Sequence, residues 1–241
     1  MRILITNDDG IRAPGIRHLV EWAKTKGEVV VVAPLVEQSA KSHAIEIHST
    51  IEVKPSDEFA GVRAFSVDST PADCVRIAKL LLKEEFDIVF SGINRGPNLG
   101  CDLVYSATVG AVFEAARFGI PAIAFSTDFD SFDNAAAKID EVYNFFEKQE
   151  LMKKNSLYNV NIPSHESRGI RITRQGRMYF SDRFGKTERE NFYQPEGYCV
   201  YEGGQDLGED IDAFKCGYIS ITPLLSTRTN LALVEQLQKE I

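Results

Sequence analysis

The sequence predicts an α/β fold in which a mostly parallel sheet lies between two layers of helices. Short runs that are apolar at nearly every position, such as Ile3–Thr6 and Val29–Ala33, alternate with segments of helical period such as Gly15–Lys26. Strands of this kind are typical of a parallel sheet covered on both faces. The 241 residues suit one large domain of this class with an appendage. We therefore expect a three-layer, Rossmann-like sandwich.

The remaining elements follow from the same periodicities. Thr70 can cap a helix whose first position is Pro71 and whose capping box is completed by Asp73. Its inward stripe is expected to hold Cys74, Ile77, Ala78, Leu81 and Leu82. Further strands are expected at Ile51–Val53, Val62–Val67, Asp87–Ser91, Ala122–Ser126, Asn159–Pro163, Ile170–Thr173 and Tyr218–Thr222. Further helices are expected at Ser106–Phe118, Asn134–Glu150 and Ser226–Ile241.

The second half of the chain changes character. Residues 174–213 are polar, aromatic and interrupted by glycines, which predicts an extended hairpin or arm. Exposed aromatic residues on an arm favour an oligomer contact. We expect a single domain over residues 1–241, with a core at 1–165. Residues 166–241 would then supply the hairpin arm, the last strand and a C-terminal helix for oligomerisation.

The composition argues against several classes of function. A formal net charge of −8 disfavours binding to nucleic-acid polymers or membranes, which requires a basic face. The four cysteines are scattered without a C-x-x-C pair, which disfavours a zinc site or a disulfide framework. The run RILIT is too short for a signal peptide, and no apolar run approaches the length of a membrane span. We expect a cytoplasmic protein.

The stretch Asn7-Asp8-Asp9-Gly10 follows the first strand directly. Adjacent side chains on a strand point to opposite faces, so the two carboxylates converge only if the chain turns at Gly10. Two carboxylates about 5 Å apart repel by about 3 kcal/mol at an effective dielectric of about 20. A divalent cation between them would remove that repulsion. The alternative is a solvated turn with a side-chain-to-backbone hydrogen bond.

Three further stretches follow strands or open a helix near the same edge. Ser39 offers a neutral oxygen after the second strand, and His43 is a candidate acid or phosphate contact. Ordinary readings remain open for both: a polar loop and a structural histidine. The run from Ser91 to Gly100 combines three glycines with asparagines and Arg95, which suits an anion or is simply a glycine-rich turn. Ser106 and Thr108 open a helix whose first N–H groups favour an anion or ordinary capping.

These stretches together predict phosphoryl chemistry. Parallel strands end at one edge of a sheet, so acids, a serine, an asparagine and an anion-binding loop should meet there. Oxygen donors suit Mg²⁺, Mn²⁺ or Ca²⁺. We expect one divalent cation per subunit, Mg²⁺ or Mn²⁺, with Ca²⁺ able to replace it in a crystal. The catalytic candidates are Asp8, Asp9 and Asn94, and the metal candidates are Asp8, Asp9, Ser39 and Asn94. The phosphate or substrate candidates are Asn7, Gly92, Arg95, Gly96, Asn98, Ser106, Thr108 and His43.

The sequence resembles the SurE family of 5′/3′-nucleotidases. The resemblance rests on ITNDDGI, APLVEQSAKSHAI, STPADCV, SGINRGPNLG and YSATVGAVFEA, and continues through NVNIP, TRQGR and GYISITPL. It spans nearly the whole chain in order. One departure is Ala107, where members commonly carry glycine, so backbone approach to a phosphate is changed there.

The resemblance implies a metal-dependent phosphomonoesterase acting on nucleoside 5′- and 3′-monophosphates, and in some members on short polyphosphate. It implies metal ligation by the residues matching Asp8, Asp9, Ser39 and Asn94. It implies phosphate contacts at Asn98, Ser106 and Thr108. It also implies a homodimer or homotetramer assembled through the C-terminal hairpin and tail.

Two other hypotheses remain open from the sequence. In one, Asp8 or Asp9 attacks phosphorus and forms an aspartyl-phosphate, although such enzymes usually carry D-x-D and a later lysine. In the other, the chain is a non-catalytic regulator that binds a nucleotide or a metal at the same edge. Trapping of a phospho-aspartate would identify the first, and tight binding without turnover would identify the second.

Overall fold

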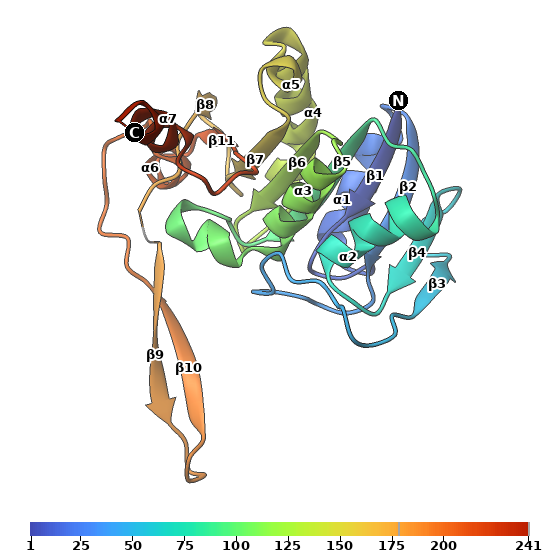
Figure 1. Cartoon of the computed structure of the whole chain (residues 1–241), viewed down its shortest axis with the longest axis horizontal. Helices are drawn as coiled ribbons and strands as arrows, with labels where there is room; N and C mark the ends of the chain where they lie inside the picture. Colours follow the sequence, from blue (N-terminus) through green and yellow to red (C-terminus); the bar gives the residue numbers. More distant parts are fainter. Residues whose placement is uncertain (178, 241) are drawn as a thin grey trace.

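The computed structural model describes residues 1–177 and 179–240. Its centre is a sheet in the order β3-β4-β2-β1-β5-β6-β7-β11-β8, with a separate hairpin of β9 and β10 (Figure 1). The strands are β1 (Arg2–Thr6), β2 (Glu28–Pro34), β3 (Val53–Ser56), β4 (Arg63–Val67), β5 (Ile88–Arg95), β6 (Ala122–Thr127), β7 (Leu157–Ile162), β8 (Ile170–Ile172), β9 (Phe180–Lys186), β10 (Tyr193–Cys199) and β11 (Ile219–Pro223). The α-helices are α1 (Pro14–Ala23), α2 (Pro71–Arg76), α3 (Ala107–Arg117), α4 (Asp133–Lys148), α5 (Leu151–Lys154), α6 (Asp210–Lys215) and α7 (Leu231–Glu240).

Six neighbouring strands pair in parallel, and their order across the sheet is β4, β2, β1, β5, β6 and β7. Because these strands run the same way, the carboxyl ends of β1, β2, β5 and β6 lie at one edge of the sheet. Within this sheet, two of the described pairings are antiparallel: β3 with β4, and β11 with β7. The expected mostly parallel α/β fold is therefore confirmed.

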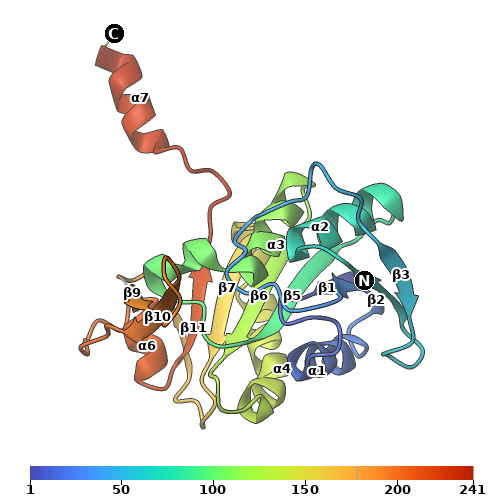
Figure 2. The ribbon, with the colours of Figure 1, turned by 90° about the horizontal axis from the view of Figure 1, so that it is seen from below.

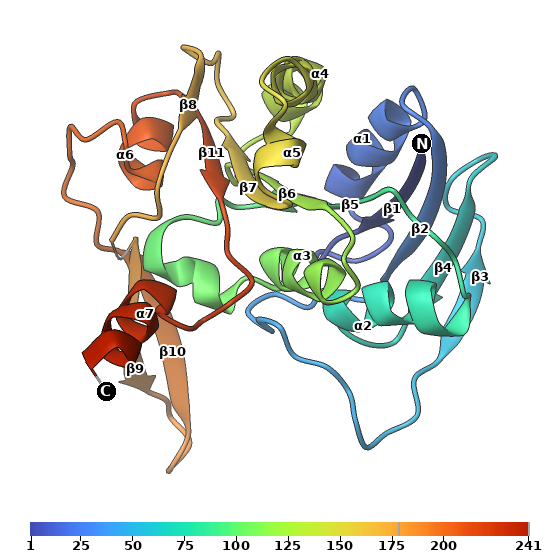
Figure 3. The ribbon, with the colours of Figure 1, turned by 45° about the horizontal axis from the view of Figure 1, so that its top comes forward.

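Helices cover both faces of the sheet (Figure 3). On one face, α1 and α4 bury Leu19 and Val142 against the odd-numbered side chains of β1, including Ile5. On the other face, α2 and α3 bury Val75 and Val112 against Leu4 and its neighbours. The alternation of Leu4 and Ile5 between two separate clusters explains why β1 is apolar at every interior position.

The helix after Thr70 begins as expected, because the Thr70 side chain accepts a hydrogen bond from the Asp73 N–H at 3.2 Å. The capping box is not completed, since the Asp73 carboxylate accepts from the Glu46 N–H at 2.8 Å instead. Beyond Arg76 the chain forms a π-helical turn over Ile77–Leu81. This turn adds a residue to the helical period, so Leu81 is 60% exposed and the expected inward position is wrong.

The hairpin β9–β10 projects from the body of the molecule and confirms the expected arm (Figure 1). Its outer aromatic residues, including Phe184 and Tyr193, are exposed. Its base is not free, because Tyr179 is buried with Leu99 and Phe214 in a third small core. That core includes α6, which overlaps the end of the stretch 174–213 that the sequence predicts to be an arm.

The end of the chain differs from the expectation in one respect. The last helix begins at Leu231 and not at Ser226, and Ile241 lies outside the described residues. Figure 2 shows α7 standing apart from the sheet, and none of its described residues is buried. The strand β11 lies inside the main sheet, so residues 166–241 contribute to the core as well as to the arm. Among the described helices, none combines the length and the apolarity that crossing a bilayer demands.

Candidate active site at the carboxyl edge of the sheet

The end of β1 forms a tight turn that buries its polar residues. Asn7 is fully buried, and its Nδ2 donates to the Gly10 carbonyl at 2.9 Å. Gly10 has a φ of +98°, a left-handed conformation that glycine adopts without a steric penalty. Asp8 is only 4% exposed, and its Oδ1 accepts a hydrogen bond from the Thr108 hydroxyl at 2.5 Å. The turn thus fixes the Asp8 carboxylate against the first turn of α3.

Both aspartates at this turn have raised pKa values. Burial raises the pKa of Asp8, and the Thr108 hydroxyl opposes that shift. Burial and then the charge of Asp8 raise the pKa of Asp9 to about 7, against the opposing hydrogen bond from the Arg95 N–H. That bond joins the Arg95 N–H to Asp9 Oδ2 over 3.1 Å. A cation beside both carboxylates would favour their ionised forms.

The loop after β2 brings Ser39 to this turn. The Gln38 N–H donates to the Asp8 carbonyl at 2.7 Å, which joins the loop directly to the aspartate pair. The Ser39 side chain is exposed and donates to Glu37 Oε1 at 2.7 Å. The serine hydroxyl keeps its lone pairs for a ligand while it donates this bond.

The glycine-rich stretch that includes the end of β5 holds its polar residues in place. Asn94 Nδ2 donates to the Gly96 carbonyl at 2.7 Å, which leaves the Asn94 side-chain oxygen for a ligand. The Gly96 N–H donates to the Thr127 carbonyl at 3.0 Å. The Arg95 Nε donates to the Phe129 carbonyl at 3.0 Å. The proposed phosphate contacts of Arg95 and Gly96 stay predictions, since the N–H of Gly96 is already used within the fold.

Close packing explains the glycine at position 92, and hydrogen bonds hold Asn98 in the same stretch. A Cβ on Gly92 would lie 2.2 Å from the Phe125 carbonyl oxygen. Asn98 is held by three neighbours: its N–H donates to Asn161 Oδ1 at 2.8 Å, its Nδ2 donates to Ser126 Oγ at 2.7 Å, and its carbonyl accepts from Asn159 Nδ2. Asn98 is therefore rigidly placed, with its second side-chain N–H left for a ligand.

The start of α3 combines capping with contact to the site. Ser106 Oγ accepts the Val109 N–H at 3.2 Å, which confirms capping by this serine. Ala107 and Thr108 are fully buried. The Thr108 hydroxyl is directed to Asp8, so the structure gives it a role that the sequence did not suggest.

One cavity of about 480 Å³ joins residues from the four stretches. Its polar lining includes Asp8, Ser39, Asn94, Arg95, Asn98 and Ser106. Its aromatic lining includes Tyr105, Phe129 and Phe180. The base of the hairpin adds Ser181, Asp182 and Gly197. The cavity thus brings together half of the candidate residues and adds an aromatic side.

The sequence-based reasoning missed the aromatic side of this cavity. Phe129 follows β6, so the rule that ligands bind beyond the carboxyl ends of parallel strands could have found it. Tyr105 directly precedes the capping Ser106 and was equally accessible to that reasoning. Phe180 and the hairpin residues had no such signal, because the position of an arm is decided by tertiary packing.

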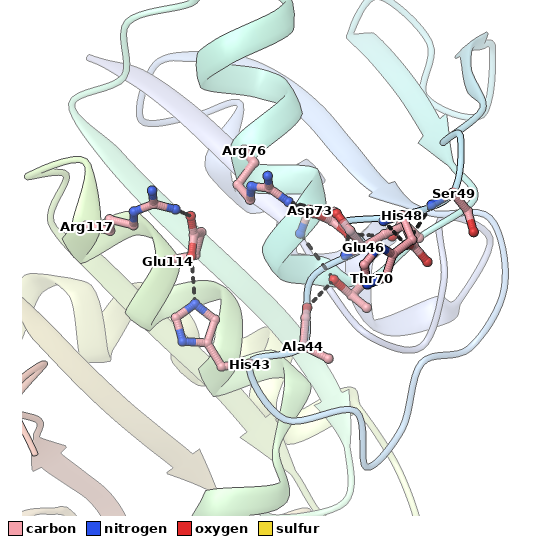
Figure 4. A network of polar contacts seen from close by, with 11 residues as sticks. His43, Ala44, Glu46, His48, Ser49, Thr70, Asp73, Arg76, Glu114 and Arg117 are labelled. Carbon is pink, nitrogen blue, oxygen red and sulfur yellow. Dashed lines mark hydrogen bonds and ion pairs between the residues drawn. The ribbon is translucent and has the colours of Figure 1, made fainter.

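His43 lies elsewhere. Its Nε2 is 2.7 Å from Glu114 Oε2, and Arg117 lies on the other side of the same carboxylate (Figure 4). His43 lines two separate cavities together with Phe113 and Arg228. A contact between His43 and a phosphate in the Asp8 cavity stays a prediction.

The donor set fits a hard divalent cation. Asp8, Ser39 and Asn94 line one cavity, and Asp9 is adjacent through its bond to Arg95. Two carboxylates with neutral oxygens are the donors that Mg²⁺ and Mn²⁺ prefer. Among the described residues, the Asn7 Oδ1 and Ser91 Oγ atoms are buried without a hydrogen-bond partner. The Asn7 oxygen directly follows β1, so it adds to the oxygen-rich character of this edge, whereas Ser91 lies within β5.

Comparisons with known proteins agree over the whole length. A family model described as survival protein SurE matches residues 3–182. A 5′-nucleotidase SurE of Caldanaerobacter subterraneus subsp. tengcongensis is 40% identical, covering 98% of this chain and 95% of the relative. A 5′-nucleotidase SurE of Thermoanaerobacter sp. is also 40% identical, with coverages of 93% and 92%. The crystal structure of the SurE protein from Aquifex aeolicus superposes with a TM-score of 0.80, at 34% identity and 99% coverage of both chains.

Proposed function

This chain belongs to the survival protein SurE family, and on that basis we propose that it is a metal-dependent nucleotidase. The substrates are nucleoside 5′- and 3′-monophosphates, with short polyphosphate as a further substrate. The names of the relatives support the nucleotidase activity. The observation that carries the proposal for this chain is the single cavity lined by Asp8, Ser39, Asn94 and Ser106.

The residues at this site have two roles in phosphate-ester hydrolysis, metal binding and phosphate binding. Asp8, Asp9, Ser39 and Asn94 would hold one Mg²⁺ or Mn²⁺ ion. Such an ion, when bound, polarises a phosphate oxygen and lowers the pKa of water. The Arg95 guanidinium, the second side-chain N–H of Asn98 and the Ser106 end of α3 are donors for the phosphate oxygens. The buried surroundings of Asp8 strengthen every charge interaction at this edge.

The aromatic side of the cavity supports a nucleoside over a bare phosphate. Tyr105 and Phe129 are 63% and 54% exposed, and Phe180 adds a third ring from the hairpin. Aromatic rings offer flat apolar faces for a base, whereas a bare phosphate would leave them in water. Arg95 binds the Phe129 carbonyl, so the polar and aromatic sides are joined through one residue.

The test is a panel of 5′- and 3′-nucleoside monophosphates and tripolyphosphate, with Mg²⁺, Mn²⁺ or EDTA. We expect phosphate release that depends on the metal and disappears with EDTA. Asp8→Asn should lower kcat/KM by more than about 100-fold, because it removes a charged metal ligand. Removing a ligand should lower activity more than removing a residue that only hydrogen-bonds to a ligand. The matched control is Asp57→Asn, the same chemical change at an exposed position, which should keep wild-type activity.

Four outcomes would contradict the proposal. Full activity of Asp8→Asn would remove the aspartate from the mechanism. Hydrolysis that persists in EDTA would remove the metal. Nucleotide binding without phosphate release under every metal condition would indicate a regulator. A phospho-aspartate trapped by borohydride during turnover would replace water by Asp8 or Asp9 as the nucleophile.

A further inference from the structure

The loop that carries Ser39 has an unusual backbone. Ala40 has a φ of +58° and Ser42 a φ of +54°, and neither is a glycine. This left-handed region is uncommon for residues with a Cβ, and two such residues in one short loop are rarer still. Such a conformation persists only when the surrounding structure imposes it, and it concentrates at functional sites. The contacts of this loop therefore show what imposes it.

Backbone and hydroxyl contacts hold the loop at two points. At its start, the Gln38 N–H donates to the Asp8 carbonyl at 2.7 Å. At its end, the Ser42 N–H donates to the Tyr105 carbonyl at 3.0 Å, and the Ser42 hydroxyl donates to the Val104 carbonyl at 2.7 Å. Ser39 lies between these two attachments, one next to the aspartate pair and the other next to the start of α3.

Helix α3 carries a glycine, Gly110, at the point where the loop contacts it. A Cβ on Gly110 would lie 2.3 Å from the Ser42 carbonyl oxygen and 3.1 Å from the His43 Cα. The loop backbone therefore rests directly on the helix, at the one residue type that permits this approach. One turn further along α3, Glu114 meets the His43 side chain.

The His43–Glu114 contact is the only one of these attachments that uses a charged side chain. Glu114 has a side chain that is only 3% exposed, and its two oxygens face His43 Nε2 at 2.7 Å and Arg117 Nη1 at 3.3 Å (Figure 4). A buried carboxylate is stable only with such partners. His43 is therefore drawn to a fixed point on α3, and the loop with it.

We propose that His43 and Glu114 form a positioning pair that fixes the loop of residues 38–43 on α3 and so directs Ser39 into the Asp8 cavity. The pair acts through the loop backbone and touches neither metal nor substrate. This inference rests on the proposed function for the identity of the ion, and on the contacts above for the loop. It gives His43 a different role from the acid or phosphate contact that the sequence suggests.

The test compares wild type with the variants His43→Ala, His43→Gln, Val142→Ala and Gly110→Ala. His43→Gln keeps an amide N–H that can reach Glu114, whereas His43→Ala removes the attachment. Val142 is buried in α4 on the opposite face of the sheet, so Val142→Ala destabilises the fold without touching the loop. The measurements are amide hydrogen exchange at Gln38 and Ser42, Mn²⁺ affinity by calorimetry, and kcat and KM at saturating Mn²⁺.

In His43→Ala we expect the Gln38 and Ser42 amides to exchange at least 10-fold faster. We expect Mn²⁺ to bind about 10-fold more weakly, the effect typical of losing an outer partner of a metal ligand. At saturating Mn²⁺, KM should stay within about two-fold, because the pair does not touch substrate. His43→Gln and Val142→Ala should retain the exchange rates of these amides and the Mn²⁺ affinity within about two-fold. A second disruption, Gly110→Ala, should reproduce the His43→Ala result by pushing the loop off α3.

The outcomes separate this inference from the proposed function. If wild type binds no Mn²⁺ and releases no phosphate, the proposed function fails. If wild type binds and turns over but His43→Ala leaves exchange or Mn²⁺ affinity unchanged, the positioning pair is wrong. A rise in KM without a change in Mn²⁺ affinity would instead make His43 a substrate contact, and equal loss in Val142→Ala would reduce the effect to general destabilisation.

Discussion

At the scale of single residues, the side chains at the start of α3 have different partners. Ser106 accepts the Val109 N–H as a cap and also lines the cavity. Thr108 donates to the Asp8 carboxylate from a fully buried position. Removing a hydroxyl that orients a metal ligand should weaken metal binding, whereas removing a hydroxyl that binds phosphate should raise KM. These two measurements therefore distinguish the two roles of Thr108.

Thr108→Val should weaken Mn²⁺ binding by about 10-fold, because the Asp8 carboxylate loses the donor that orients it. Calorimetry without substrate measures this directly. Thr108→Ser keeps the hydroxyl and should bind Mn²⁺ like wild type. Unchanged Mn²⁺ affinity in Thr108→Val, together with a raised KM, would return Thr108 to the phosphate-binding role that the family resemblance implies.

The sequence predicted which residues gather but not which hydrogen bonds they make. Asp8, Ser39 and Asn94 were predictable because each lies near or after the carboxyl end of a strand, and parallel strands end at one edge. The partner of His43 was not predictable, because Glu114 lies in the middle of a helix and its carboxylate faces the loop only after α3 is packed. The role of Thr108 was hidden for the same reason, since its contact joins segments 100 residues apart.

At the scale of elements, one buried aspartate joins three parts of the chain. Asp210, at the start of α6, is fully buried. Its Oδ2 accepts the Gly100 N–H at 3.0 Å, and its Oδ1 accepts the Gly176 and Ile211 N–H groups, both at 2.8 Å. The carboxylate therefore fixes the end of the glycine-rich stretch to the segment that leads into the hairpin.

Asp210→Asn should lower the free energy of unfolding by about 1–3 kcal/mol, because the new amide NH₂ would face the N–H of Gly100 or Gly176, donor against donor. Urea unfolding measures this loss. The matched control is Asp206→Asn, which alters an ion pair with Arg174 at a position that is about half exposed. That change should cost clearly less than Asp210→Asn, because an exposed ion pair contributes little to stability. Equal losses in the two variants would show that the buried network contributes nothing beyond the surface pair.

Elements were predictable where several turns or strand positions repeat a pattern. The strands β1, β2 and β6 each contain an unbroken run of apolar residues, so they were found nearly to the residue. Helix α6 was missed because Asp210–Lys215 is too short to show a period. The sequence analysis placed the start of α7 at Ser226, whereas the helix begins at Leu231. Asn230 caps it, because Asn230 Oδ1 accepts the Leu233 N–H at 3.0 Å. That asparagine is a recognisable cap, and the apolar pattern begins only after it.

At the scale of the whole molecule, α7 stands apart from the sheet (Figure 2). None of its described residues is buried, although it carries apolar side chains that include Leu231, Val234 and Leu237. The hairpin likewise exposes Phe184 and Tyr193. Apolar surface left in water on both segments supports the expectation of a homodimer or homotetramer, which stays a prediction.

Removal of residues 226–241 should therefore leave the free energy of unfolding of the core nearly unchanged while reducing the size of the assembly. Light scattering after size-exclusion chromatography measures the mass, and urea unfolding at low concentration measures stability. Identical masses for the full and shortened chains would show that α7 is not the contact. A large loss of stability at low concentration would show that α7 packs on its own body in solution.

The central place of β1 has a consequence for the synthesis of the chain. This strand is made before both of its neighbours, since Ile3 pairs with Val29 on one side and with Ile88 on the other. One edge of an apolar strand thus stays unpaired until β5 has been made. Unpaired edges of apolar strands are sites of aggregation. The nascent chain is therefore most in need of a chaperone between the completion of β2 and the arrival of β5.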